Sequence, residues 1–454
     1  MIAIAATLIA MVLAFCLAVV GDLLIHRQSV DLFEWNQSFL VGLSVTALAF
    51  VPASILLPGN ALTATAVCLI VVGLLGIRRL FGLSSPQSIQ GLRFALQNDK
   101  WSRVFLIVIG LVFFQFIVQN ARFSYFWDGY QIWATKALVM YHTGALGKQW
   151  VAPGEQERLT SYPHIVPLYE ALVARIQGAF AWEALKPVFT VFYLSLLVAM
   201  VQAARLLVSL RIALAVTALV ALLPAVSTRF SVGGYADMPQ AAFLAATIAA
   251  LLQISIDSKA DWRTPAPWLI GGLALVKNEG LLLALIVCTT VIFSWLLVRP
   301  AGLRARFRPY RSATAIVAGS LSVRLLSMVW LHSNDPTYGP LDQAHFARAY
   351  ANLLTVPRLC IQQMLIASEW GVFWPAFGLA VIIVALLGSQ RERAVVAGTA
   401  AALAAYTSIF YMTNWELSLH ISQAFNRLLV QIAPLAALAM GVAYSRVRGE
   451  RPQL

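Results

Sequence analysis

Charged residues are scarce in this chain of 454 residues, at 11% of the total, whereas soluble globular proteins contain about 25%. So few charges cannot cover the surface of a soluble protein of this length. Hydrophobic residues make up 60% of the chain, and the mean hydropathy is +0.79. This content excludes a disordered protein. The composition therefore predicts an all-α polytopic membrane protein.

Cysteine and the common catalytic motifs are also scarce. The four cysteines are widely separated within or beside apolar segments, so they indicate neither a disulfide framework nor a metal-ligand spacing. The chain contains no GxSxG or HExxH motif, no P-loop and no Rossmann fingerprint. No cofactor is predicted from these absences, and a divalent metal is not indicated.

Thirteen apolar segments are candidates to cross the ~30 Å core of a bilayer. They are 2–20, 39–57, 61–77, 104–120, 187–204, 212–226, 239–256, 267–276, 281–298, 312–331, 371–388, 394–412 and 425–444. The eighth and ninth belong to one apolar run, interrupted by a polar tetrad at 277–280. One continuous helix over that run would be about 48 Å long, so we expect a turn at the tetrad.

Basic residues are distributed unevenly over the loops between these segments. Alternate loops, together with the tail from Arg446, hold 20 of the 32 Lys and Arg and 8 of the 19 Asp and Glu. The loops on the other side hold 11 of each sign. The positive-inside rule therefore predicts a cytoplasmic C-terminus. Because the positive charge follows the loops in this way, the net charge of +13 does not indicate a nucleic-acid partner.

The first long outer stretch, 121–186, contains Asp128 directly after Trp127. From Tyr130 onward, apolar residues recur at i, i+3, i+4 and i+7, which predicts an amphipathic helix in the membrane interface. An ionised carboxylate at this boundary is costly, so Asp128 is a candidate general base. Gln131 follows three residues later, and a helix cap is therefore an equally good interpretation.

Tyr162 and His164 lie on either side of a proline in the same stretch, and a second interfacial helix is predicted from there to about Phe180. Both side chains are able to hydrogen-bond a substrate, which makes them candidate binding residues. The alternative interpretation is an ordinary Tyr-Pro turn without a role in binding.

Asp237, with Gln240 three residues later, is either a second helix cap or an acid that faces Asp128 across an outer cavity. Lys277 and Glu279 belong to the polar tetrad. They either mark the tip of a hairpin or present a cation to an anionic ligand at the membrane surface.

His420 and Arg427 are seven residues apart before the last segment, two turns on one helix face. Arg427 either snorkels to the interface or points inward as a phosphate ligand. Arg324 lies inside the tenth segment, where an arginine is by default functional or paired. Acids and cations near the outer boundary favour an anionic lipid substrate with a phosphate leaving group.

The order of several short motifs resembles bacterial GT-C glycosyltransferases, the group of the protein mannosyltransferases and the lipid A core sugar transferases. The motifs are WDGYQIWATKA (127–137), YPHIVPLYEAL (162–172), GYADMP (234–239) and LVKNEGLL (275–282), followed by the outer His/Arg pair. The resemblance implies a GT-C-like core over 104–454, preceded by N-terminal membrane helices and a basic loop over 1–103.

The resemblance also implies an inverting transfer of a sugar from a polyprenyl-phosphate carrier to an envelope glycan, lipid or protein. The reaction would occur on the non-cytoplasmic face of the bacterial inner membrane. Asp128 matches the acid that deprotonates or orients the acceptor hydroxyl, and Asp237 matches the acid that shapes the acceptor or metal environment. Lys277, His420 and Arg427 would hold the carrier phosphate. The acidic pair of some members is absent, which argues against a metal.

A transporter or flippase of a lipid-linked substrate is the alternative hypothesis. Such proteins contain inverted repeats with paired broken helices, whereas this sequence has one interrupted run, at 277–280. Polar residues of a transporter also line the membrane midplane, and here all candidates except Arg324 gather at the outer boundary. The sequence therefore favours the glycosyltransferase.

Overall fold

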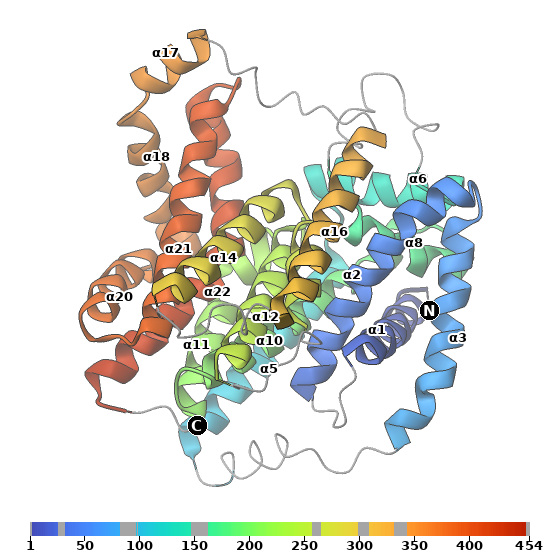
Figure 1. Cartoon of the computed structure of the whole chain (residues 1–454), viewed down its shortest axis with the longest axis horizontal. Coiled ribbons are helices and arrows are strands. Elements are labelled where there is room, and N and C mark those ends of the chain that lie inside the picture. The colour runs from blue at the N-terminus through green and yellow to red at the C-terminus, as the bar shows by residue number, and fades with distance from the viewer. Residues whose placement is uncertain are drawn as a thin grey trace.

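The computed structural model describes residues 2–25, 32–81, 97, 99–146, 162–256, 265–297, 308–330 and 343–450. Within these residues the fold is a bundle of helices without a β-strand (Figure 1). The helices are α1 (Ile2–Ile25), α2 (Leu32–Leu56), α3 (Ala61–Phe81), α5 (Lys100–Arg122), η1 (Gly129–Ala134), α6 (Thr135–Thr143), α8 (Ile165–Gln177), α9 (Trp182–Leu185), α10 (Pro187–Arg205), α11 (Leu210–Leu222), η2 (Ala225–Arg229), α12 (Asp237–Ile256), α13 (Ala266–Leu273), α14 (Asn278–Leu297), α16 (Arg308–Trp330), α17 (Gln343–Ala351), α18 (Thr355–Met364), α19 (Ala367–Trp370), α20 (Phe373–Leu387), α21 (Gln390–Ile409), η3 (Phe410–Met412) and α22 (Leu417–Val447).

Each of the thirteen predicted apolar segments coincides with a helix. Among the described residues, seven helices are long and apolar enough to cross a membrane, and five further helices contain shorter apolar stretches. The predicted turn at the polar tetrad is confirmed, because α13 ends at Leu273 and α14 begins at Asn278. The protein is therefore an all-helical membrane protein, and the count of thirteen crossings stays a prediction.

The longest helix, α22, lies at the centre of the bundle. Of its most apolar stretch 89% is buried, because α11, α12, α20 and α21 all pack on it. At the periphery, α5 exposes Ile107, Leu111 and Phe114 along its length. A helix that is apolar all round and exposed on its outer face suits a lipid environment.

The N-terminal helices belong to the same core as the rest of the chain. α1 and α2 pack on each other, and they also contact α8, α10 and α13. One continuous apolar core therefore includes residues from both predicted regions, 1–103 and 104–454. At the other side of Figure 1, α17 and α18 extend beyond the end of the bundle next to α21.

Both helices predicted in the first outer stretch are present, with differences. The helix from Tyr130 begins as the π-helix η1 and continues as α6. The second is α8, which ends at Gln177 and not at Phe180. The first ten residues of α8, 165–174, are all buried, because α1, α2, α3 and α6 surround the helix. It is an interior element of the bundle, and its place in the membrane interface stays a prediction.

Candidate active site

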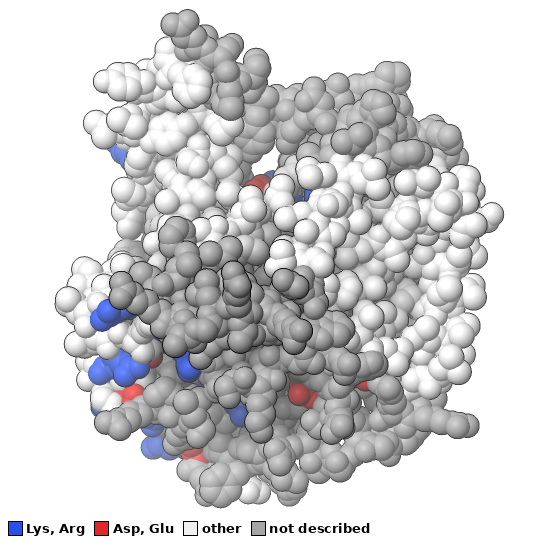
Figure 2. All heavy atoms as spheres, in the orientation of Figure 1, with Lys and Arg blue, Asp and Glu red and all other residues white. Residues whose placement is uncertain are grey.

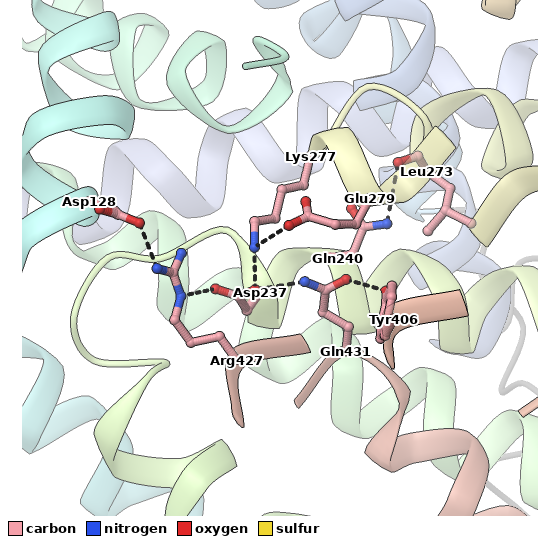
Figure 3. Close-up of polar contacts among 9 residues, drawn as sticks. All are labelled: Asp128, Asp237, Gln240, Leu273, Lys277, Glu279, Tyr406, Arg427 and Gln431. Atoms are coloured by element: carbon pink, nitrogen blue, oxygen red, sulfur yellow. Dashed lines mark hydrogen bonds and ion pairs between the residues drawn. The ribbon is translucent and has the colours of Figure 1, made fainter. Parts of the chain in front are cut away.

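Charged residues from four separate parts of the chain meet in one place (Figure 3). Asp128 directly precedes η1, and Asp237 is the first residue of α12. Lys277 and Glu279 lie at the break between α13 and α14, and Arg427 lies in the third turn of α22. The structure thus brings together five of the eight residues that the sequence analysis selected.

Asp237 lies at the centre of these five residues, which we call the ion-pair network. Its Oδ1 is 2.7 Å from Lys277 Nζ, and its Oδ2 is 3.1 Å from Arg427 Nε. Arg427 Nη1 lies 2.6 Å from Asp128 Oδ2, and Lys277 Nζ lies 3.3 Å from Glu279 Oε1. Each carboxylate therefore contacts at least one cation.

The network runs from the protein interior to an exposed end. The side chain of Asp237 is 0% exposed, that of Arg427 14% and that of Asp128 35%. Asp128 Oδ1 accepts no hydrogen bond from the residues that the structure describes. Figure 2 shows acidic and basic atoms at the floor of a hollow between the α17–α18 segment and α16. A charged site that is open on one side is able to admit a polar substrate group.

Further polar contacts extend the network into the bundle. Gln431 Nε2 donates a hydrogen bond of 2.7 Å to Asp237 Oδ1, and the Tyr406 hydroxyl donates one of 2.6 Å to Gln431 Oε1. The guanidinium carbon of Arg427 lies 4.3 Å from the ring centre of Tyr235. Both oxygens of the buried Asp237 are therefore hydrogen-bonded, which a buried charge requires.

Neither acid caps a helix, so the capping interpretation is wrong for both Asp128 and Asp237. The Asp128 side chain makes no cap hydrogen bond. The Asp237 carboxylate accepts all its hydrogen bonds from side chains, those of Lys277, Arg427 and Gln431. Charged donors bind a carboxylate more strongly than a neutral backbone N–H does. Tertiary partners therefore take the place of the caps.

Two glycines allow the loops that carry these acids to touch. A Cβ atom on Gly129 would lie 2.1 Å from the carbonyl oxygen of Gly233. Gly234 has φ +78°, and a Cβ atom there would lie 2.3 Å from the ring of Tyr125. Only glycine fits both the close approach and the left-handed backbone. The local sequence therefore permits the contact on which the ion-pair network depends.

Tyr162 and His164 lie outside the ion-pair network. The ring of Tyr162 packs edge-on against Trp133 at 5.4 Å, and its carbonyl oxygen accepts a hydrogen bond from Lys136 Nζ. His164 is buried, with Nε2 2.9 Å from the carbonyl oxygen of Ala47. Burial lowers the pKa of His164 to about 3, so its imidazole is neutral. These contacts fasten the loop to α6 and α2.

His420 is also held apart from the network. Its Nδ1 lies 2.7 Å from Thr413 Oγ1, and its ring lies next to those of Phe410 and Trp415. Seven residues along α22 separate it from Arg427, which corresponds to about 10 Å. The described contacts of His420 are those of a side chain that anchors the start of α22.

Two further cations are buried outside the network. Arg324, noted in the sequence as an intramembrane arginine, donates a 2.6 Å hydrogen bond to Asn278 Oδ1. Lys136, which the sequence analysis did not select, is buried in α6. Burial, and then the positive charge of Arg324, lower the pKa of Lys136. The apolar periodicity from Tyr130 places Lys136 away from the apolar stripe, so the sequence carried no signal for its burial.

Neither a metal site nor a similar protein assigns a function to the ion-pair network. In the described ranges, no three His, Cys, Asp or Glu side chains are close enough to hold a metal ion. No protein-family model matches the chain, and no curated protein matches it in sequence. Any functional conclusion therefore depends on the chemistry of the ion-pair network.

Proposed function

We propose that the protein is a membrane glycosyltransferase. It transfers a sugar from a polyprenyl-phosphate carrier to a hydroxyl group of an envelope glycan, lipid or protein on the non-cytoplasmic face. The observation that carries the proposal is the carboxylate of Asp128, which is 35% exposed and lies 2.6 Å from Arg427. A base for the acceptor and a cation for the leaving phosphate are thereby adjacent.

In the proposed reaction, Asp128 Oδ1 takes the proton of the acceptor hydroxyl. The hydroxyl oxygen attacks the anomeric carbon of the sugar and forms the new glycosidic bond. The bond between that carbon and the carrier phosphate breaks, and the phosphate oxygen leaves with the electron pair. Asp128 Oδ2 stays bound to Arg427 Nη1, so the base keeps its orientation during the transfer.

The candidate phosphate ligands are the cations of the ion-pair network and Arg324. The three carboxylates and two cations of the network sum to −1, and Arg324, which binds Asn278 next to Lys277, changes the sum to 0. Arg427 Nη2 donates no hydrogen bond to any residue that the structure describes. We assign it to the carrier phosphate, where it would stabilise the charge that the phosphate gains on leaving. This assignment keeps Lys277 and Arg427 as phosphate ligands and replaces His420 with Arg324.

The test is bond cleavage in lipid vesicles. The purified protein is incubated with radiolabelled polyprenyl-phosphate hexoses and pentoses and an envelope extract as acceptor, without ATP or an ion gradient. We expect label in the extract and free polyprenyl phosphate in the lipid phase. The same transfer in detergent, where no compartments exist, would separate this function from transport. Movement of intact donor across sealed vesicles without any cleavage would contradict the proposal and support the transporter hypothesis.

A further inference from the structure

A second buried polar cluster lies behind Asp128 and has no part in the proposed chemistry. The Tyr125 hydroxyl donates a 2.6 Å hydrogen bond to Glu170 Oε1. Lys186 Nζ donates to the carbonyl oxygen of Val232 and lies 4.9 Å from the ring centre of Tyr125. Glu170 and Lys186 are both buried. We call Tyr125, Glu170 and Lys186 the positioning cluster.

This cluster contacts both loops that carry the acids. Tyr125 lies three residues before Asp128, and Val232 lies five residues before Asp237. The other two members come from helical parts of the core, Glu170 from α8 and Lys186 from the start of α10. The loop of Asp128 is therefore fastened to α8 and to the start of α10, and the turn before Asp237 is fastened to the start of α10.

The ring of Tyr125 is enclosed on several sides. Trp182 and Phe189 pack edge-on against it, with ring centres 6.4 and 6.1 Å away. The backbone of Gly234 occupies a further side, where a Cβ atom would overlap the ring. The hydroxyl bond to Glu170 then fixes how far the ring extends into the core. A shift of Tyr125 would displace Asp128 along the same short loop.

The buried carboxyl of Glu170 has a cost that packing alone does not explain. Its Oε2 has no hydrogen-bond partner in the described part of the chain, and such a group lowers stability. Burial raises the pKa of Glu170 to about 8, so the carboxyl is protonated near neutral pH. What the group supplies is one oriented acceptor for Tyr125.

We propose that Tyr125, Glu170 and Lys186 are positioning residues that hold the loop of Asp128 against the turn that leads to Asp237. Their effect on catalysis rests on the proposed function, whereas their effect on the two loops does not. The prediction for the loops is specific, because the Phe126 N–H donates a 3.0 Å hydrogen bond to the Gly233 carbonyl oxygen. Loss of the cluster should weaken that bond.

The experiment measures hydrogen exchange of the whole protein in lipid nanodiscs. Tyr125→Phe is compared with wild type for amide exchange in peptides over 123–130 and 230–236. Lys186→Met is the second variant. Tyr169→Phe is the matched control, because the Tyr169 hydroxyl is also buried and donates a 2.6 Å bond, to the Ala10 carbonyl oxygen in α1. We expect faster exchange in both peptides for the first two variants and unchanged exchange there for Tyr169→Phe.

Sugar transfer gives the second readout. Tyr125→Phe and Glu170→Met should lower kcat about 10- to 100-fold through misplacement of the base, with the KM for the donor unchanged. Glu170→Gln keeps the acceptor oxygen and should restore most of kcat. Wild-type exchange in Tyr125→Phe, or the same acceleration in Tyr169→Phe, would overturn the proposal. If the wild-type protein transfers no sugar, the proposed function fails, and the exchange data still decide on the positioning cluster.

Discussion

Two groups of ion pairs lie on the same helix, α22, and differ in what their acids do. Near the end of the helix, Arg446 binds both oxygens of Glu392 at 2.7 and 3.0 Å. Glu392 Oε2 also accepts the Ser389 N–H at 2.6 Å and completes a capping box at the start of α21. Roughly 28 Å away along the helix, Arg427 binds two acids that cap nothing.

The same three-residue spacing between two polar residues has two outcomes. At Ser389 and Glu392 it forms a capping box for α21, and Glu392 also binds Arg446 of the neighbouring helix α22. Asp128 and Asp237 each precede a polar residue by the same spacing, yet neither caps its helix, and their carboxylates bind cations from other parts of the chain. An acid that serves local structure is therefore told apart from an acid of the site by a backbone N–H among its partners.

The largest expected effect is on sugar transfer. Asp128→Asn should lower kcat by about 10²- to 10⁴-fold, because the general base is lost, with little change in the unfolding temperature. Glu392→Gln should lower the unfolding temperature and leave kcat almost unchanged, since its carboxylate caps α21 and binds Arg446. Rate assays and thermal unfolding on both variants check the pair. If the Asp128→Asn variant still transfers sugar at the wild-type rate, Asp128 is not the general base.

The second effect is on stability. Arg427→Met leaves Asp128 without a cation and Asp237 with Lys277 alone, and removal of one partner from buried charges costs about 3–5 kcal/mol. Arg446 is 28% exposed, and the buried Glu392 keeps the Ser389 N–H when this cation is removed, so Arg446→Met should cost less, about 1 kcal/mol. Chemical unfolding of the detergent-solubilised protein measures both. Equal losses in the free energy of unfolding for the two variants would mean that the two groups of ion pairs contribute equally to stability.

The third effect is a pH dependence of the stability, which comes from the buried carboxyl of Glu170. Burial raises the pKa of Glu170 from its ordinary value of 4.5 to about 8. The folded state thus favours the protonated carboxyl, and its contribution to stability is complete below pH 4.5 and lost as the pH rises through 8. Tyr125 and Lys186 face this group. Unfolding temperatures from pH 5 to 9 should fall more for wild type than for Glu170→Gln, and parallel curves would contradict this.

The smallest effect compares two glycines with left-handed backbones, Gly234 (φ +78°) at the site and Gly449 (φ +68°) just beyond α22. Alanine in this conformation costs about 1–2 kcal/mol at either position. Only at Gly234 does the added Cβ atom meet another group, the ring of Tyr125, whereas nothing lies within 4 Å of it at Gly449. Gly234→Ala should therefore also lower sugar transfer. Similar activity in the two variants would show that the loop contact tolerates displacement.

The helices could be predicted from the sequence because their signals are local. Apolar length marks each of the thirteen segments, and the polar tetrad at 277–280 marks the break between α13 and α14. The helix after Asp128 follows from its apolar periodicity. Its π-helical start does not, because no residue type specifies η1.

Where the helices lie, and which charged residues are unusual for an apolar chain, can be predicted from the sequence alone. It could not separate Asp237 and Arg427, which enter the ion-pair network, from His164 and His420, which do not. That separation depends on the packing of the helices, since Asp128 and its partner Arg427 are 299 residues apart. A cap or an apolar face is encoded within a few residues. The pairing of charges from distant helices depends on how α22 packs against α12, and no local pattern specifies that packing.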